Sequence, residues 1–180
     1  MRIDKILLCV LVSLSKPVLA VSMHDFRELS AHYGNALQIP PVSNNITIVL
    51  AQVAPNLPQT YETSNFSETS VLASSALGAV YCFEFIVKES RLAPDARLIY
   101  RDIDFNAPPN AISPIIGAEV IGRFSQLFWG RDITESELVT MTDVSAKIMN
   151  ELPMVVSSTK LYLRYQCTIM ASALDSLIVR

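Results

Sequence analysis

Residues 66–90 read FSETSVLASSALGAVYCFEFIVKES, and the rest of the predicted fold is organised around this stretch. Ser67 and Glu68 suit a helix start, because a serine oxygen accepts backbone N–H groups and a carboxylate favours the positive end of a helix. Apolar residues then recur at helical spacing, at Leu72, Ala76, Ala79, Val80, Phe83 and Val87. Small side chains around Gly78 would let another helix approach closely. The stretch therefore predicts a central, mostly buried helix.

The composition limits the classes of protein to which the chain can belong. A length of 180 residues suggests one domain, and 51% hydrophobic against 17% charged residues permits a sizeable core. The net charge is -3, so we expect no basic surface for nucleic acid. With five glycines and ten prolines, tight hairpins are disfavoured and the prolines are left to separate helices.

The N-terminal segment has the pattern of a secretory signal sequence. Arg2 and Lys5 give it a basic start, the run from Ile6 to Leu14 is apolar, and a cut is expected after Ala20. We therefore predict a signal peptide at residues 1–20.

Two alternatives for this segment stay open. An uncleaved membrane anchor would need about 20 apolar residues, more than the segment offers. A lipoprotein would be modified at Cys9, although little apolar sequence precedes that cysteine. With the signal removed, we expect residues 21–180 to form a periplasmic or secreted helical domain that meets a membrane only during export.

Helical spacing predicts five further helices, mostly ended by prolines. Their expected bounds are Ser22–Gln38, Ser43 or Asn44 to Val53, Ser113–Gly130, Thr134–Leu152, and Ser157 or Ser158 to Ile178. Thr134 with Glu137 forms a capping box, the sharpest local signal in the chain. The segment from Arg91 to Asn110 is rich in proline and predicts a long crossover loop. The fold class is thus mainly α, about six helices in a single helical-bundle domain.

Two cysteines, Cys82 and Cys167, remain in the chain after signal cleavage. Cysteines of exported proteins usually pair, so we predict a disulfide between the central helix and the last one. Two separate buried thiols are the alternative.

The two histidines raise the question of haem binding. No Cys-x-x-Cys-His attachment motif is present, and His24 and His32 both fall in the first predicted helix. A cytochrome-like module that has lost its haem, or binds it non-covalently through one of these histidines and a methionine such as Met141, is the alternative function.

A calcium loop is suggested by three ligand-like side chains at alternate positions, Asp102, Asp104 and Asn106. The pattern then fails, because Ala107 replaces the turn glycine and Ser113 replaces the bidentate glutamate. We favour a polar loop in which Ile103 and Phe105 point inward. Motifs of hydrolases and nucleotide-binding enzymes do not occur in the sequence, so we expect no enzymatic activity and no cofactor.

Phe128 and Trp129, beside Arg131, form a possible contact patch. Ordinary core packing of Trp129 is the alternative, and the stronger one.

Several segments together resemble an uncharacterised helical region of large exported proteins of Gram-negative bacteria, which carry laminin-G-like or cadherin-like modules. The matching segments are Phe26-Arg27-Glu28-Leu29, Ala79-Val80-Tyr81-Cys82 and Cys167-Thr168. The segment Phe128 to Thr134 is also similar to helical domains that accompany bacterial cytochrome c modules. The resemblance implies no particular activity. We expect a non-enzymatic structural or partner-binding component of the cell envelope, whose partner is another envelope or secreted protein.

Overall fold

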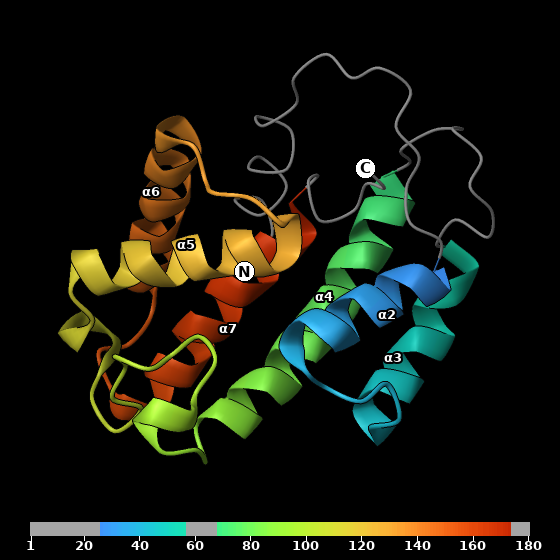
Figure 1. Cartoon of the computed structure of the whole chain (residues 1–180), viewed down its shortest axis with the longest axis horizontal. Coiled ribbons are helices and arrows are strands. Elements are labelled where there is room, and N and C mark those ends of the chain that lie inside the picture. The colour runs from blue at the N-terminus through green and yellow to red at the C-terminus, as the bar shows by residue number, and fades with distance from the viewer. Residues whose placement is uncertain (1–25, 57–67, 174–180) are drawn as a thin grey trace.

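The computed structural model describes residues 26–56 and 68–173. Within them the chain forms six α-helices and no strand, which confirms the mainly α prediction (Figure 1). The helices are α2 Phe26–Leu37, α3 Asn44–Val53, α4 Glu68–Glu89, α5 Pro114–Trp129, α6 Glu135–Glu151 and α7 Val156–Ser172. The predicted signal peptide, the helix-start residue Ser67, and His24 and Ile178 lie outside the described residues.

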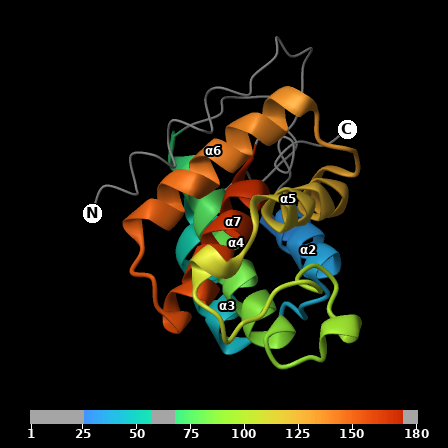
Figure 2. The same cartoon turned by 90° about the vertical axis from the view of Figure 1, so that its left-hand side faces the viewer.

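The helices α4 and α7 lie side by side at the centre and run in opposite directions (Figure 1). On one side α4 contacts α2 and α3, and on the other α7 contacts α5 and α6 (Figure 2). Among the described residues, α4 is the one helix whose length and composition would allow it to cross a membrane, a test that buried core helices also pass. Most of α4 is buried in the protein.

Small residues bring α4 and α7 close together. A Cβ atom added to Gly78 would lie 3.2 Å from the Cβ atom of Ala171, nearer than side chains normally approach. The hydroxyl of Tyr33, on α2, donates a 2.8 Å hydrogen bond to the carbonyl oxygen of Ala171 at the same point. The close approach expected around Gly78 is therefore present, and it joins three helices.

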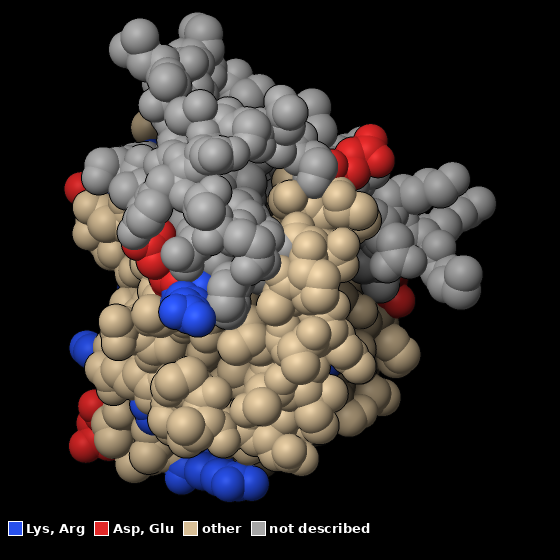
Figure 3. Space-filling view, turned by 90° about the vertical axis from the view of Figure 1, so that its right-hand side faces the viewer, with Lys and Arg blue, Asp and Glu red and all other residues tan. Residues whose placement is uncertain are grey.

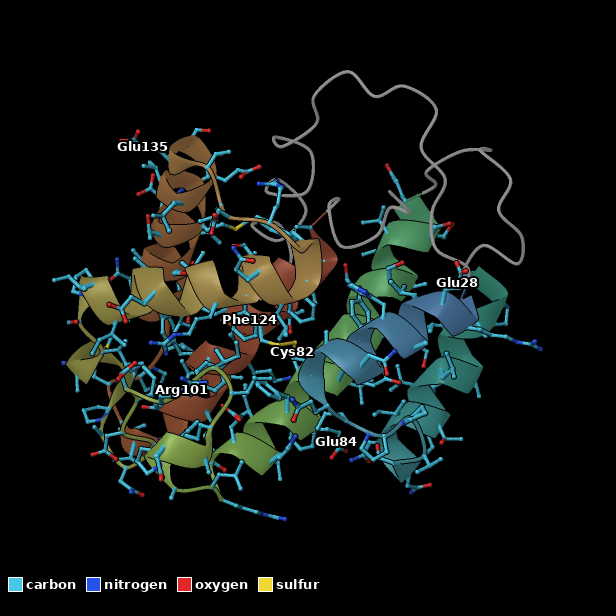
Figure 4. The ribbon with its side chains drawn as sticks, in the orientation of Figure 1. Glu28, Cys82, Glu84, Arg101, Phe124 and Glu135 are labelled. Atoms are coloured by element: carbon cyan, nitrogen blue, oxygen red, sulfur yellow. A yellow bond between two sulfur atoms is a disulfide. The ribbon has the colours of Figure 1, made fainter. Side chains whose placement is uncertain are left out.

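One helical turn further along, Cys82 of α4 is bonded to Cys167 of α7, as predicted (Figure 4). Both cysteines are fully buried, and they are separated by 85 residues of sequence. The bond therefore closes a loop that includes the crossover, α5 and α6.

The apolar stripe that the sequence shows on α4 does not coincide with the buried face of this helix. Leu72 is 55% exposed and Phe83 is 40% exposed. The fully buried side chains instead include those of Leu77, Tyr81 and Phe85, which belong to the hydrophobic core. The helix carries apolar residues on more than one side, so the spacing alone did not show which side meets α7.

Local capping signals correctly placed three helix starts and one end. The side chains of Ser43, Ser113 and Thr134 each accept a hydrogen bond from the first turn of their helix, and the box with Glu137 is complete. Gly130 ends α5 with a φ of 63°, a left-handed conformation that glycine adopts readily.

The predicted cap of the last helix is wrong. α7 begins after Val155, whose side chain makes no capping hydrogen bond, and Ser157 and Ser158 lie within its first turn. Ser158 is buried, so tertiary packing of the first turn sets this helix start.

The proline-rich crossover is organised by the buried carboxylate of Glu89, at the end of α4. Its side chain is 1% exposed and accepts backbone N–H groups from three consecutive residues: Leu98 at 2.8 Å, Ile99 at 3.0 Å and Tyr100 at 3.1 Å. This segment forms no strand and curves around the carboxylate. Burial of Ile103 and Phe105 confirms that both point inward.

A glutamine in place of Glu89 should destabilise the protein strongly. The amide keeps only one acceptor oxygen and turns a donor toward the N–H groups, so we expect Glu89→Gln to lower the free energy of unfolding by about 2–4 kcal/mol. The matched control is Glu84→Gln, because Glu84 is partly exposed and accepts one bond, from Asn45. Urea titrations measure both. Equal, small losses in the two variants would contradict the role given to Glu89.

The disulfide should make a large contribution to stability. In the chain-entropy model a loop of this length is worth about 4–5 kcal/mol. We expect Cys82→Ala combined with Cys167→Ala to lower the free energy of unfolding by that amount, while the far-ultraviolet circular dichroism stays helical. A loss below about 1 kcal/mol would show that the bond constrains the unfolded chain little.

Candidate functional site

A groove with a volume of about 610 Å³ lies between α3 and α4. Its lining residues are Asn45, Ile48, Val49, Gln52, Val53, Ala76, Ala79, Val80, Phe83 and Arg164. All four α4 residues of this lining, Ala76, Ala79, Val80 and Phe83, belong to the apolar stripe that the sequence shows. The uncovered part of that stripe is thus the floor of the groove.

Large apolar side chains are exposed to solvent along this groove. Ile48 on α3 is 49% exposed and Phe83 on α4 is 40% exposed. No charged residue occurs in α3, whose sequence is NNITIVLAQV. Seen from the side of α2 and α3, the described surface is mostly uncharged, and its charged side chains lie mainly near the margins (Figure 3).

One cationic side chain, Arg164 of α7, reaches the groove. Its guanidinium carbon lies 5.3 Å from the centre of the Phe83 ring, which is a cation–π contact. Within the described residues its guanidinium makes no ion pair and no hydrogen bond. By contrast, Arg123 binds Asp102 at 2.7 Å. Arg164 was not identified from the sequence. The signal that could have pointed to it is the uncharged sequence of α3, which leaves an arginine packed beside that helix without an acidic partner there.

A second, smaller cavity of about 150 Å³ lies between α5, α6 and α7. Gln166 lines it and donates to the Tyr162 hydroxyl at 3.0 Å and to the Ser145 hydroxyl at 3.3 Å. The amide oxygen of Gln166 has no hydrogen-bond partner among the described residues. Burial raises the pKa of Tyr162, so this hydroxyl stays protonated at neutral pH. The group is a neutral, largely enclosed polar cluster in the core.

The aromatic residues of the predicted contact patch, Phe128 and Trp129, lie in the core. This was the stronger alternative for Trp129. Phe128 is 2% exposed and Trp129 is 5% exposed, with the indole N–H donating to the carbonyl oxygen of Met170 at 3.2 Å. Arg131 stacks on Trp129 at 5.1 Å and holds both carboxylate oxygens of Glu137, at 2.7 and 2.9 Å. These side chains join the end of α5 to the start of α6. The prediction that the two aromatic rings form an exposed contact patch is therefore wrong.

Two of the three calcium-like side chains, those of Asp102 and Asp104, have partners within the protein. Asp102 pairs with Arg123, and Asp104 accepts the backbone N–H of Asn106 at 2.8 Å. Across residues 26–56 and 68–173, three or more His, Cys, Asp or Glu side chains do not gather in a group that would hold a metal ion. The loop structure therefore agrees with the polar-loop interpretation.

The histidine that the structure describes, His32, is half-buried on α2. Its ring lies 5.8 Å from the ring of Tyr33 and 6.4 Å from that of Phe128. Met141 is buried in α6. The haem-binding interpretation stays a prediction, since its other histidine is outside the described residues.

Comparisons with known proteins find no matching family model, no similar curated protein and no similar solved structure. The resemblance to helical regions of large exported proteins therefore stays a prediction.

The pair Arg131–Glu137 should make stability depend on pH in acid. Hydrogen bonds from Arg131, supported by the Thr134 backbone, lower the pKa of Glu137 from 4.5 to about 2, against the effect of burial. A lowered pKa in the folded state stabilises the protein above pH 4.5, and this contribution is lost as the pH falls toward 2. Its upper limit is about 3 kcal/mol.

We therefore expect Glu137→Gln to lower the free energy of unfolding by about 1–3 kcal/mol at pH 7, with a flatter profile between pH 4.5 and 2. Guanidinium titrations at several pH values measure this. The control is Glu119→Gln, which removes an exposed partner of Arg123 and should change stability by less than about 1 kcal/mol. An unchanged acid profile in Glu137→Gln would contradict the assignment.

Proposed function

We propose that this protein is an exported, non-enzymatic helical protein of the cell envelope that binds another envelope or secreted protein. The occupant of the groove between α3 and α4 is a helical segment of that partner. The observation that carries the proposal is the apolar groove itself, which exposes Ile48 and Phe83 although a core stripe continues into it. Grooves of this kind accept the apolar face of an amphipathic helix.

Export is supported by two features of the chain. The N-terminal segment has a basic start followed by an apolar run, and the two cysteines that follow it form a buried bond. Disulfides persist mainly in oxidising compartments such as the periplasm and the extracellular space.

The groove also has the size and chemistry of a protein contact surface. Its floor is built from small side chains such as Ala76 and Ala79, which let a helix approach closely, and Phe83 provides an aromatic ring for contact. Buried aromatic anchors dominate the energetics of many interfaces.

Site-specific photo-crosslinking tests the proposal. We expect p-benzoylphenylalanine at position 48 to give an adduct with another protein in the native host, and the same probe at position 139 to give none. Val139 is 55% exposed on α6, away from the groove lining, so it controls for exposure alone. Mass spectrometry of the adduct must place the crosslink in a helical segment of the partner.

Three outcomes would overturn the proposal: no adduct at position 48, an adduct with a second copy of this chain, or equal labelling from position 139. Export is checked on the same sample by intact mass. A mature chain that begins at Val21 supports it, and a retained leader with free thiols contradicts it.

A further inference from the structure

We propose that the helix bound in the groove is acidic, with carboxylates along the edge that meets α7. This inference rests on the proposed function and names the chemistry of the partner. It follows from the charges that border the groove.

Among the described residues that line the groove, Arg164 is the one charged side chain. Arg164 lies on the α7 side, and Lys160 precedes it by one helical turn, so both lie on the same face of α7. Lys160 is exposed, and neither side chain forms an ion pair within the described residues. The α7 edge of the groove is therefore positive.

The opposite edge of the groove is formed by α3, which has no charged residue. The carboxylate nearest in sequence to the floor is Glu84, and Asn45 donates to it at 2.7 Å from the α3 side. A helix with an apolar face and acidic residues on one flank matches both edges, whereas a basic helix would place like charges beside Arg164.

The position of Arg164 also suits it to bind a carboxylate. Stacking on Phe83 holds the guanidinium plane while leaving its N–H groups without hydrogen bonds to described residues. A planar guanidinium with free donors binds a carboxylate through two parallel hydrogen bonds. Arg164 is the residue we expect to select the acidic partner, with Lys160 adding long-range attraction.

Crosslinking from position 48 in charge variants tests this. We expect Arg164→Glu to reduce the adduct yield at least about tenfold and Arg164→Gln by a smaller factor, because reversal adds repulsion to the loss of the bond. The matched control is Arg91→Glu, an exposed arginine after α4 and outside the groove lining, which should leave the yield unchanged. Circular dichroism confirms that each variant is folded.

The result separates this inference from the proposed function. An adduct that persists in Arg164→Glu, or a crosslinked partner segment without Asp or Glu on its flank, overturns the acidic helix while partner binding stands. An adduct whose added mass is that of a fatty acid identifies an anionic lipid and overturns both. Loss of the crosslinked adduct in Arg164→Glu supports the inference, provided that mass spectrometry maps the wild-type crosslink to an acidic amphipathic segment.

Discussion

The close approach of α4 and α7 at Gly78 is the contact on which the rest of the fold depends. A Cβ atom at position 78 would lie 3.2 Å from that of Ala171, so any larger residue there would push the two helices apart by a few tenths of an ångström. The tight packing places the carbonyl of Ala171 within reach of Tyr33 and puts Cys82 beside Cys167. Helix α2 and the α5–α6 pair are thereby attached to one central pair of helices.

Two buried charged side chains bind the backbone of the crossover loop between its two short 3-10 helices, Pro94–Ala96 and Pro109–Ala111. Glu89 accepts three backbone N–H groups, and Arg97 donates to the carbonyl oxygens of Tyr100 and Ile103. Buried backbone groups must find partners, and here side chains replace a strand neighbour. Burial, together with the charge of Glu89, raises the pKa of Tyr100, whose hydroxyl donates to Leu163 on α7. The loop is thus tied to both central helices.

Helix boundaries were predicted correctly where the signal lies in the local sequence. Thr134 with Glu137 and Gly130 act within a few residues of themselves, so helix boundaries followed from them directly. The start of α7 at Val155 depends on tertiary packing and has no local cap to reveal it. Arg164 was missed for a similar reason, because its importance comes from the helix beside it. The sequence left two alternatives open for Trp129, core packing and an exposed contact patch. An aromatic residue at the end of a helix is compatible with both, and the structure shows that Trp129 is buried.

The apolar stripe of α4 explains why a groove exists at all. α3 has 10 residues and α4 has 22, so their lengths are about 15 Å and 33 Å. A short helix cannot cover the outer face of a long one, and Leu72 and Phe83 stay exposed on that face. The close packing of α4 against α7 is at Gly78 and Cys82, and α7 reaches the exposed face through Arg164, which stacks on Phe83. The presence of apolar residues on that face is therefore better explained by a contact that completes the cover of α4 than by the stability of the isolated chain.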